Sequence, residues 1–271
     1  MKTNNMKRNW IVNQTEINVA QWDNVMETFY PESKLYLRDP NEYVKRLCVE
    51  CNYLDAVKVL DWNKLLKPES VILDLACGGG WLSGYLSTFS QVKAIYALDS
   101  SKRFLSELLY ATVKILNGNP KKITTIEALF SPILLENSTL DMVVSSSSLH
   151  HADSLEGVLK EIRRVLKDDG ILVILNETPY SNLKHILSST RSFIRILYKL
   201  LFRKYVSTSA SVTACGHLYD PILGDKNYPL WYWREVIKKA GFRLIEERDT
   251  KMPTVKGKNM TSLTHFVCKV I

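Results

Sequence analysis

The stretch most suited to chemistry is an apolar run, Val71–Leu75, followed after two residues by three consecutive glycines, Gly78–Gly80. The apolar run predicts a strand that is buried on both faces. Glycines let the backbone adopt positive φ and approach a ligand closely, and the helix expected after them points free N–H groups at the same place. The pattern predicts a cofactor-binding turn at the carboxyl end of a central parallel strand. The alternative is a purely structural strand–turn–helix connection.

An acidic residue, Asp99, ends the next expected strand, Val92–Leu98. At a crevice of this kind, a carboxylate in that position can bind the two hydroxyls of an adenosine ribose. Asp99 could also cap the following helix, and both roles can hold together. Dinucleotides and S-adenosylmethionine (SAM) are the two cofactor classes that use this design.

Two histidines, His150 and His151, follow a later expected strand, Asp141–Ser146, and are the candidate catalytic residues. His150 is the first candidate for a general base and His151 the weaker one. The alternative is that both are structural residues at a strand end. No metal site is expected, because the CxxC-like pair Cys48 and Cys51 has no second pair nearby.

The elements that must position these residues alternate between strand and helix, which predicts a doubly wound α/β fold. The expected sheet is Rossmann-like, seven-stranded and mostly parallel, with an antiparallel hairpin at its C-terminal end. A helix is expected to start at Asp153–Glu156 and to end at Gly170. The expected strands are 71–75, 92–98, 123–127, 141–146, 171–175, 242–247 and 263–270.

Three regions are expected: a helical N-terminal cap (1–66), the core (67–178 and 230–271) and an inserted helical lid (179–229). In the lid, Leu183–Val206 has an apolar stripe opposite five basic residues, which predicts a basic amphipathic helix. It could simply cover the substrate with its charged face in water. It could also bind an anionic membrane surface or an acidic, lipid-like substrate.

Composition narrows the class of protein. The chain has 271 residues, a formal net charge of +8 and 46% hydrophobic residues, as in an ordinary globular protein. No apolar run is long enough to span a bilayer, and the first residues do not resemble a secretory signal. A cytoplasmic protein is expected, with peripheral membrane attachment left open. Much of the basic excess is local, which makes a nucleic-acid partner the less favoured interpretation.

Four segments in order, Asp74–Gly80, Ala97–Asp99, Leu140–His151 and Arg164–Val173, resemble successive motifs of class I SAM-dependent methyltransferases. The chain looks most like the branch that modifies small molecules and quinone-type lipids. The resemblance covers about residues 68–176 and, through the closing hairpin, 230–271. Ala76 stands where that family most often has glycine, but alanine is small enough for the turn to survive.

The resemblance implies a role for each matching residue. The turn would hold the methionine end of SAM, Asp99 the ribose and Ser100 the adenine, while two further residues would contact the adenine and two serines would line the methyl-transfer side. Residues from the cap and the first helix would cover the cofactor. The turn residues are Asp74, Ala76, Cys77, Gly78 and Gly80, and the two further adenine contacts are Glu127 and Ala128. The serines on the methyl-transfer side are Ser145 and Ser146. The covering residues are Tyr30, Tyr36, Arg38 and Trp81.

The function implied is methyl transfer from SAM, with S-adenosylhomocysteine as product, to an oxygen, nitrogen or carbon of a small-molecule or lipid-like acceptor. The alternatives are an RNA or other nucleic-acid methyltransferase and a non-catalytic SAM-binding protein. An NAD(P)-dependent oxidoreductase is less favoured, because no hydride-transfer pair is evident. The acceptor and the oligomeric state do not follow from the sequence.

Overall fold

The computed structural model describes residues 8–9, 37–180, 211–212, 218–219, 225–257 and 261–271. The predicted covering residues Tyr30 and Tyr36 and the predicted amphipathic helix Leu183–Val206 lie outside these ranges.

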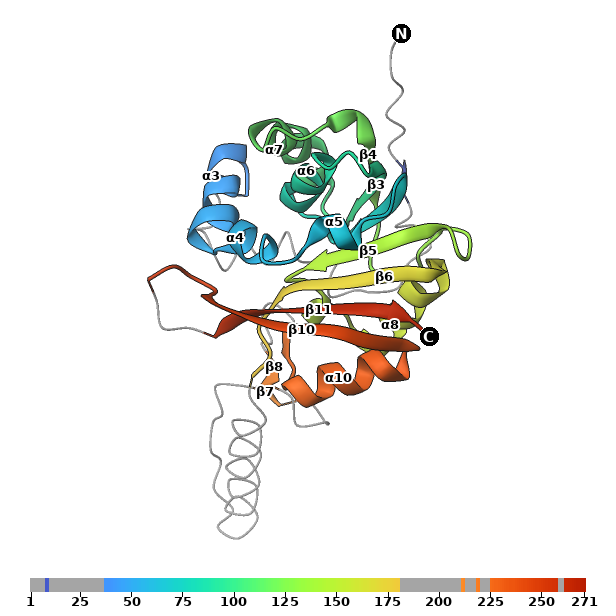
Figure 1. Ribbon diagram of the computed structural model, residues 1–271. Helices are drawn as coiled ribbons and strands as arrows, with labels where there is room; N and C mark the ends of the chain where they lie inside the picture. Colours follow the sequence, from blue (N-terminus) through green and yellow to red (C-terminus); the bar gives the residue numbers. More distant parts are fainter. Residues whose placement is uncertain (1–7, 10–36, 181–210, 213–217, 220–224, 258–260) are drawn as a thin grey trace.

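One large sheet runs through the molecule in the order β1-β4-β3-β2-β5-β6-β11-β10 (Figure 1). Neighbours from β1 to β6 are parallel, while β11 pairs antiparallel with β6 and β10 antiparallel with β11. The predicted fold class is therefore confirmed. The sheet has one strand more than predicted, the two-residue β1. The strands are β1 (Arg8–Asn9), β2 (Ser70–Leu75), β3 (Val92–Asp99), β4 (Ile123–Glu127), β5 (Leu140–Ser146), β6 (Leu166–Glu177), β10 (Phe242–Pro253) and β11 (Ser262–Val270).

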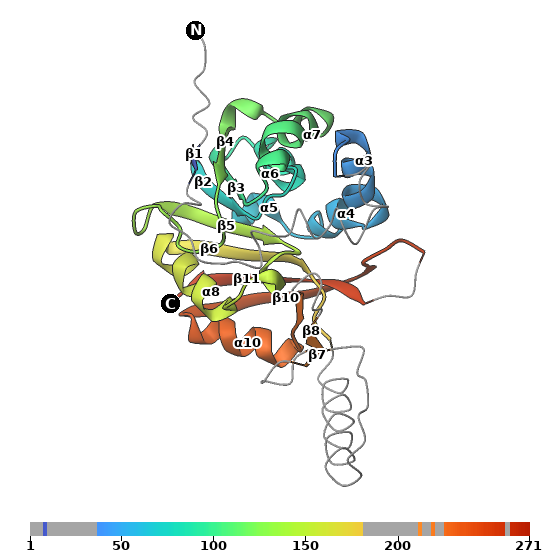
Figure 2. The same cartoon turned by 180° about the vertical axis from the view of Figure 1, so that it is seen from behind.

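Helices cover both faces of this sheet, which explains why its central strands are mostly apolar. In β2, Leu73 and Leu75 face a core shared with α8 and α10, whereas Ile72 faces a core shared with α5, α6 and α7. Figure 2 shows α8 in front of the sheet and α10 below it. These helices are α5 (Trp62–Leu65), α6 (Trp81–Ser87), α7 (Leu109–Ile115), α8 (Leu155–Val165) and α10 (Leu230–Lys239). Short helical turns also occur at Phe104–Leu108, Pro120–Lys122 and Leu149–His151.

Residues 37–66 of the predicted N-terminal cap are mainly helical and pack on the α7 side of the sheet (Figure 1), whereas Arg8–Asn9 forms strand β1. The helical part consists of α3 (Pro40–Val44), a π-helix (Lys45–Glu50), α4 (Tyr53–Val57) and α5. The Oδ1 atom of Asp39 accepts hydrogen bonds from two N–H groups at the start of α3. The cap also reaches the C-terminal hairpin, because Asn52 Nδ2 donates to the carbonyl of Pro253 over 2.8 Å. The cap therefore contacts the rest of the fold in two places, on the α7 side of the sheet and at the C-terminal hairpin.

The described part of the predicted lid does not include Leu183–Val206, the segment predicted as an amphipathic helix, so that prediction is not tested. It contains a small antiparallel sheet formed by β7 (Ser211–Val212), β8 (Leu218–Tyr219) and β9 (Lys226–Asn227). A parallel bridge between Tyr180 and Pro229 brings the two ends of the insertion together. Within the described residues, the insertion is therefore a β-structure attached beside β6 and α10.

No helix among the described residues combines the length and the apolar character required to cross a membrane.

Candidate active site

A cavity of about 250 Å³ lies where the order of the sheet reverses, outside the carboxyl ends of β2 and β5. In open α/β sheets, ligands bind at such a reversal point. The structure brings ten of the predicted site residues to the wall of this cavity: Asp74, Ala76, Cys77, Gly78, Trp81, Asp99, Ser100, Ala128, Ser146 and His151. Gly80, Glu127, Ser145, His150 and Arg38 are described but do not line it. The predicted site is thus mostly one continuous surface.

The glycine turn has the left-handed backbone that its sequence predicts. Gly78 and Gly80 have φ of +54° and +80°, and Ala76 between them and β2 has φ of +58°. Asp99 ties this turn to the end of β3, because its Oδ2 accepts from Gly78 N over 2.7 Å and its Oδ1 accepts from Ser101 N over 2.8 Å. Asp99 therefore has a structural role in holding the loops, in addition to lining the cavity.

Tyr43 of α3 is a site residue that the sequence analysis missed. Its hydroxyl oxygen accepts a hydrogen bond from Gly79 N over 2.8 Å, and the side chain is buried. A Cβ at Gly79 would lie 2.8 Å from the Tyr43 ring, and one at Gly78 would lie 2.6 Å from its hydroxyl oxygen. The first two glycines are therefore required by a packed side chain as well as by any ligand. Only a generic helical pattern marked Tyr43 in the sequence.

Asp74, at the end of β2, is almost fully buried in the cavity wall. Its Oδ2 accepts a hydrogen bond of 2.6 Å from Ser83 Oγ on α6. Burial raises the pKa of Asp74 to about 7, against the opposing effect of the Ser83 hydrogen bond. A carboxyl group with this pKa can gain or lose its charge near neutral pH when a ligand arrives.

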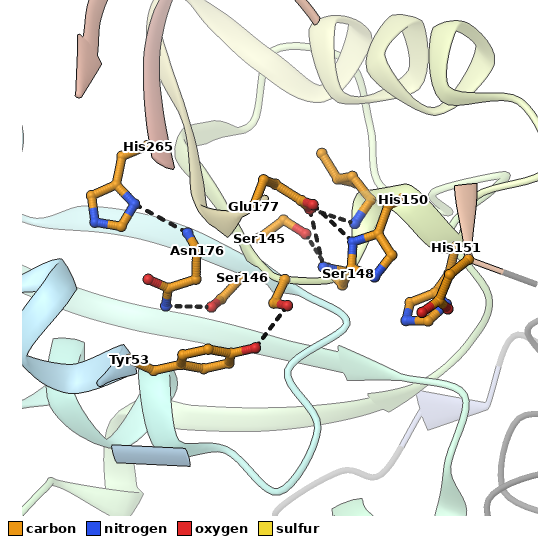
Figure 3. A network of polar contacts seen from close by, with 12 residues as sticks. Tyr53, Ser145, Ser146, Ser148, His150, His151, Asn176, Glu177 and His265 are labelled. Carbon is orange, nitrogen blue, oxygen red and sulfur yellow. Dashed lines mark hydrogen bonds and ion pairs between the residues drawn. The ribbon is translucent and has the colours of Figure 1, made fainter. Parts of the chain in front are cut away.

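Serines at the end of β5 and just after it form another part of the cavity wall. Ser145 is fully buried, donates to the carbonyl of Leu75 and lies 2.6 Å from Ser148 Oγ, so its role is structural. Ser146 Oγ accepts from Asn176 Nδ2 over 3.0 Å, and the Tyr53 hydroxyl donates to Ser147 Oγ over 2.8 Å. Figure 3 shows this network beside the end of β6. Of the two predicted serines, only Ser146 faces the cavity.

His150 is paired with Glu177, a residue at the end of β6 that was not predicted as part of the site. His150 Nδ1 lies 2.7 Å from Glu177 Oε2, and Glu177 Oε1 accepts from the backbone N–H groups of Ser148 and Leu149 (Figure 3). Burial alone would lower the pKa of His150, but the negative charge and hydrogen bond of Glu177 outweigh it and raise that pKa. A buried carboxylate thus fixes this imidazole.

His151 reaches the cavity and has a different partner. Its Nδ1 lies 2.8 Å from Oδ1 of Asp225, which precedes β9. Burial and the neighbouring His150 lower the pKa of His151, although Asp225 opposes this shift. The two imidazole centroids are 4.3 Å apart. The weaker candidate of the sequence analysis is therefore the one that faces the cavity, and Asp225 is a further residue that was missed.

Gly80, Glu127 and Arg38 do not line the cavity, and Trp81 lines it as a packed side chain. A Cβ at Gly80 would lie 2.6 Å from Leu109 Cγ, so this glycine allows α7 to pack on the turn. Glu127 pairs with Asp99 in the ladder of β3 and β4 and is half-buried. Trp81 is buried, with its ring centroid 6.0 Å from that of Tyr53. Arg38 is exposed.

Residues 73–174 match the model of a family described as "Methyltransferase domain". The chain is 26% identical over 184 residues to a sterol 24-C-methyltransferase of Schizosaccharomyces pombe, covering 68% of the chain and 42% of that protein. It is 31% identical over 103 residues to a mitochondrial arginine-hydroxylase of Homo sapiens, covering 37% of the chain and 27% of that protein. The chain thus spans less than half the length of these curated relatives.

Among solved structures, the chain resembles 1,6-didemethyltoxoflavin-N1-methyltransferase of Burkholderia thailandensis, which was determined with its substrate and S-adenosylhomocysteine bound. The TM-score is 0.59 with 12% identity, and the match covers 96% of the chain and 93% of that protein. At this identity the likeness is one of fold.

Proposed function

We propose that this chain, whose residues 73–174 form a methyltransferase domain of the SAM-dependent class, transfers the methyl group of SAM to a small-molecule or lipid-like acceptor. The observation that carries the proposal is the shared cavity of Asp74, the left-handed turn and Asp99 at the reversal point of the sheet. The sterol methyltransferase relative supports an acceptor of the small-molecule class.

In the proposed complex, Asp74 and the turn Ala76–Gly78 hold the methionine end of SAM. Asp99 accepts hydrogen bonds from the ribose hydroxyls, and its position on the cavity wall supports this. Ser100 and Ala128 line the adenine side, and their position on the cavity wall supports this. Glu127 does not line the cavity, so we assign the adenine contact to Ala128.

The transferred methyl group is already activated by the sulfonium of SAM, so the protein mainly supplies alignment and a dry pocket. Ser146 and His151 face the acceptor in this proposal, and their position in the lining of the same cavity supports this. The buried wall of Trp81, Leu82 and Phe104 keeps water from the reacting atoms. We further propose that the N-terminal cap and residues 179–229 select the acceptor.

Calorimetric titration of the full chain with SAM, S-adenosylhomocysteine and NADPH tests the cofactor assignment. Both sulfur ligands should bind and NADPH should not, and Asp99→Ala should weaken SAM binding about tenfold or more because it removes a charge-assisted hydrogen bond. Asp168→Asn is the matched control, because its side chain is 95% exposed. Absence of SAM binding, or unchanged affinity in the Asp99 variant, would refute the assignment.

Binding alone does not establish methyl transfer, because a curated relative has the name of a hydroxylase. Turnover with methyl-labelled SAM and pooled phenolic, sterol and quinone-type acceptors tests the reaction itself. Label in an organic-extractable product supports a small-molecule acceptor. Label incorporated only into added RNA would favour the nucleic-acid alternative instead.

A further inference from the structure

Three side chains with metal-ligand chemistry lie together at the edge of the cavity, where His151 is the one that lines its wall. One ligand atom from each of His150, His151 and Asp225 lies within 4.8 Å of the other two. The histidines come from the short helical turn after β5, whereas Asp225 comes from the segment that leads into β9. The fold therefore brings together groups that are 74 residues apart in the sequence, as His151 and Asp225 are.

Two of the facing atoms are buried and already close together. His151 Nδ1 and Asp225 Oδ1 are shielded from solvent and lie 2.8 Å apart as an ion pair. Neither atom has another hydrogen-bond partner among the described residues. A divalent cation can bind a lone pair of each atom in place of the proton that they share.

The third group is the imidazole of His150, and a carboxylate holds it as carboxylates hold metal-binding histidines in other proteins. Glu177 Oε2 engages His150 Nδ1 over 2.7 Å, which leaves Nε2 as the nitrogen that can bind an ion. Glu177 is itself fixed by two backbone N–H groups, those of Ser148 and Leu149. Carboxylates behind a ligating imidazole commonly orient the ring and raise its basicity. His150 is thus fixed in orientation by a buried contact.

We propose that His150, His151 and Asp225 bind one divalent transition-metal ion of the zinc, cobalt or iron(II) class at the wall of the cavity. Two imidazoles with one carboxylate form a ligand set that suits these borderline ions. Ligands at about 2.0–2.2 Å from an ion stand roughly 3.0–3.5 Å apart, so the cluster needs to contract by on the order of 1–2 Å.

The nearby cation Lys226 does not occupy the cluster. Its Nζ donates to the carbonyl of Ala152 over 2.6 Å and lies 3.7 Å from Asp153 Oδ1. The carboxylates of Asp225 and Glu177 supply negative charge on the other side. An incoming divalent ion is therefore met by two carboxylates, while the ammonium of Lys226 is balanced elsewhere.

Three protein ligands leave positions on the ion open to the cavity, because His151 lines it. An acceptor hydroxyl bound there loses its proton more readily, since the ion acts as a Lewis acid. The hydroxyl proton passes to solvent water, the oxygen forms its new bond to the methyl carbon, and the carbon–sulfur bond breaks with its electrons on sulfur, which yields S-adenosylhomocysteine. This use of the ion rests on the proposed function, whereas metal binding itself does not.

The test is titration of Co²⁺ into the chelator-treated full chain, followed by calorimetry and by visible absorption of the bound cobalt. One ion per chain should bind with a spectrum of nitrogen and oxygen ligands. Asp225→Asn and His151→Gln should each weaken binding by about 10- to 100-fold or more, and Glu177→Gln by a factor in the same range. Asp153→Asn, beside the cluster but outside it, should bind as the parent chain does.

No binding of one cobalt per chain, equal affinity in the Asp225 variant, or charge-transfer absorption from cysteine thiolates would overturn the proposal. Circular dichroism of each variant identifies a loss of fold, and in that event Glu177→Gln decides by its own cobalt affinity. SAM titration of the same samples separates the two proposals. Cobalt binding without SAM binding refutes only the methyltransferase proposal, and SAM binding without cobalt binding refutes only the metal site.

Discussion

The Asp74→Asn variant is expected to be more stable than the parent chain, and this difference in stability is expected to grow as the pH rises. The pKa of this buried carboxyl is about 7 instead of its ordinary 3.8, because burial disfavours the charged form. Between these two values the folded chain holds a proton that the unfolded chain has lost, so stability falls as pH rises through this window. Asparagine carries no such penalty and can still accept from Ser83 through its amide oxygen.

The difference between 3.8 and about 7 corresponds to roughly 4 kcal/mol above pH 7, at 1.36 kcal/mol per pKa unit. Part of this is already present at pH 5, so the advantage of Asp74→Asn should grow by roughly 2.5 kcal/mol between pH 5 and pH 8. Urea unfolding of both proteins at pH 5, 6, 7 and 8 measures this growth directly. A constant offset from the altered hydrogen bond to Ser83 does not affect this growth.

The matched control is Asp168→Asn, because the Asp168 side chain is 95% exposed and its carboxylate stays solvated. Its difference from the parent chain should stay flat over the same pH range. The reasoning is refuted if the Asp74 variant also keeps a constant difference from pH 5 to pH 8. Saturating SAM should reduce the pH dependence of the parent chain, because the ligand ammonium favours an ionised carboxylate.

Three further substitutions test the turn, each by urea unfolding. Ala76→Gly should add up to about 1 kcal/mol, because the cost of an alanine at φ +58° exceeds the extra freedom of glycine in the unfolded chain. Gly80→Ala should cost about 2–4 kcal/mol, from its φ of +80° and a contact of 2.6 Å with α7; Gly257→Ala, at φ +76° with open space around it, should lose only the backbone part. Tyr43→Phe should cost about 1–3 kcal/mol, because it leaves the buried N–H of Gly79 without its acceptor, and an unchanged stability would contradict the assigned hydrogen bond.

The elements of the fold were predictable where the local pattern and the tertiary contacts agree. The mostly apolar runs of β2, β3 and β5 identified these strands, and the glycine turn was located from its three glycines. The helix expected to run to Gly170 ends instead at Val165. Leu166 already pairs with Leu140 of β5, and the ladder then resumes at Ile171. Strand pairing therefore overrides the helical pattern of the last residues, which no local signal reveals.

The candidate site was predictable only in part, because several of its contacts join residues that are distant in the sequence. Glu177 is 27 residues from His150, and Tyr43 is 36 residues from Gly79. Each lies in an ordinary helix or strand pattern, so its residue type and spacing indicate no role. Asp225 was missed for the same reason, because it lies in a polar segment without a recognisable motif. The sequence analysis therefore identified the residues that belong to recognisable motifs. It did not identify the residues that contact those motifs from distant parts of the chain.

The hydrogen bond between Tyr43 and Gly79 has a consequence for how such domains are inherited and reused. The segment that matches the methyltransferase family, residues 73–174, does not contain α3, yet α3 supplies the side chain that packs on its central turn. An excised copy of that segment would expose the turn and lose part of its wall. The matched segment is therefore not self-sufficient here, and a chimera that exchanges it must carry α3 of the same parent to keep its pocket intact.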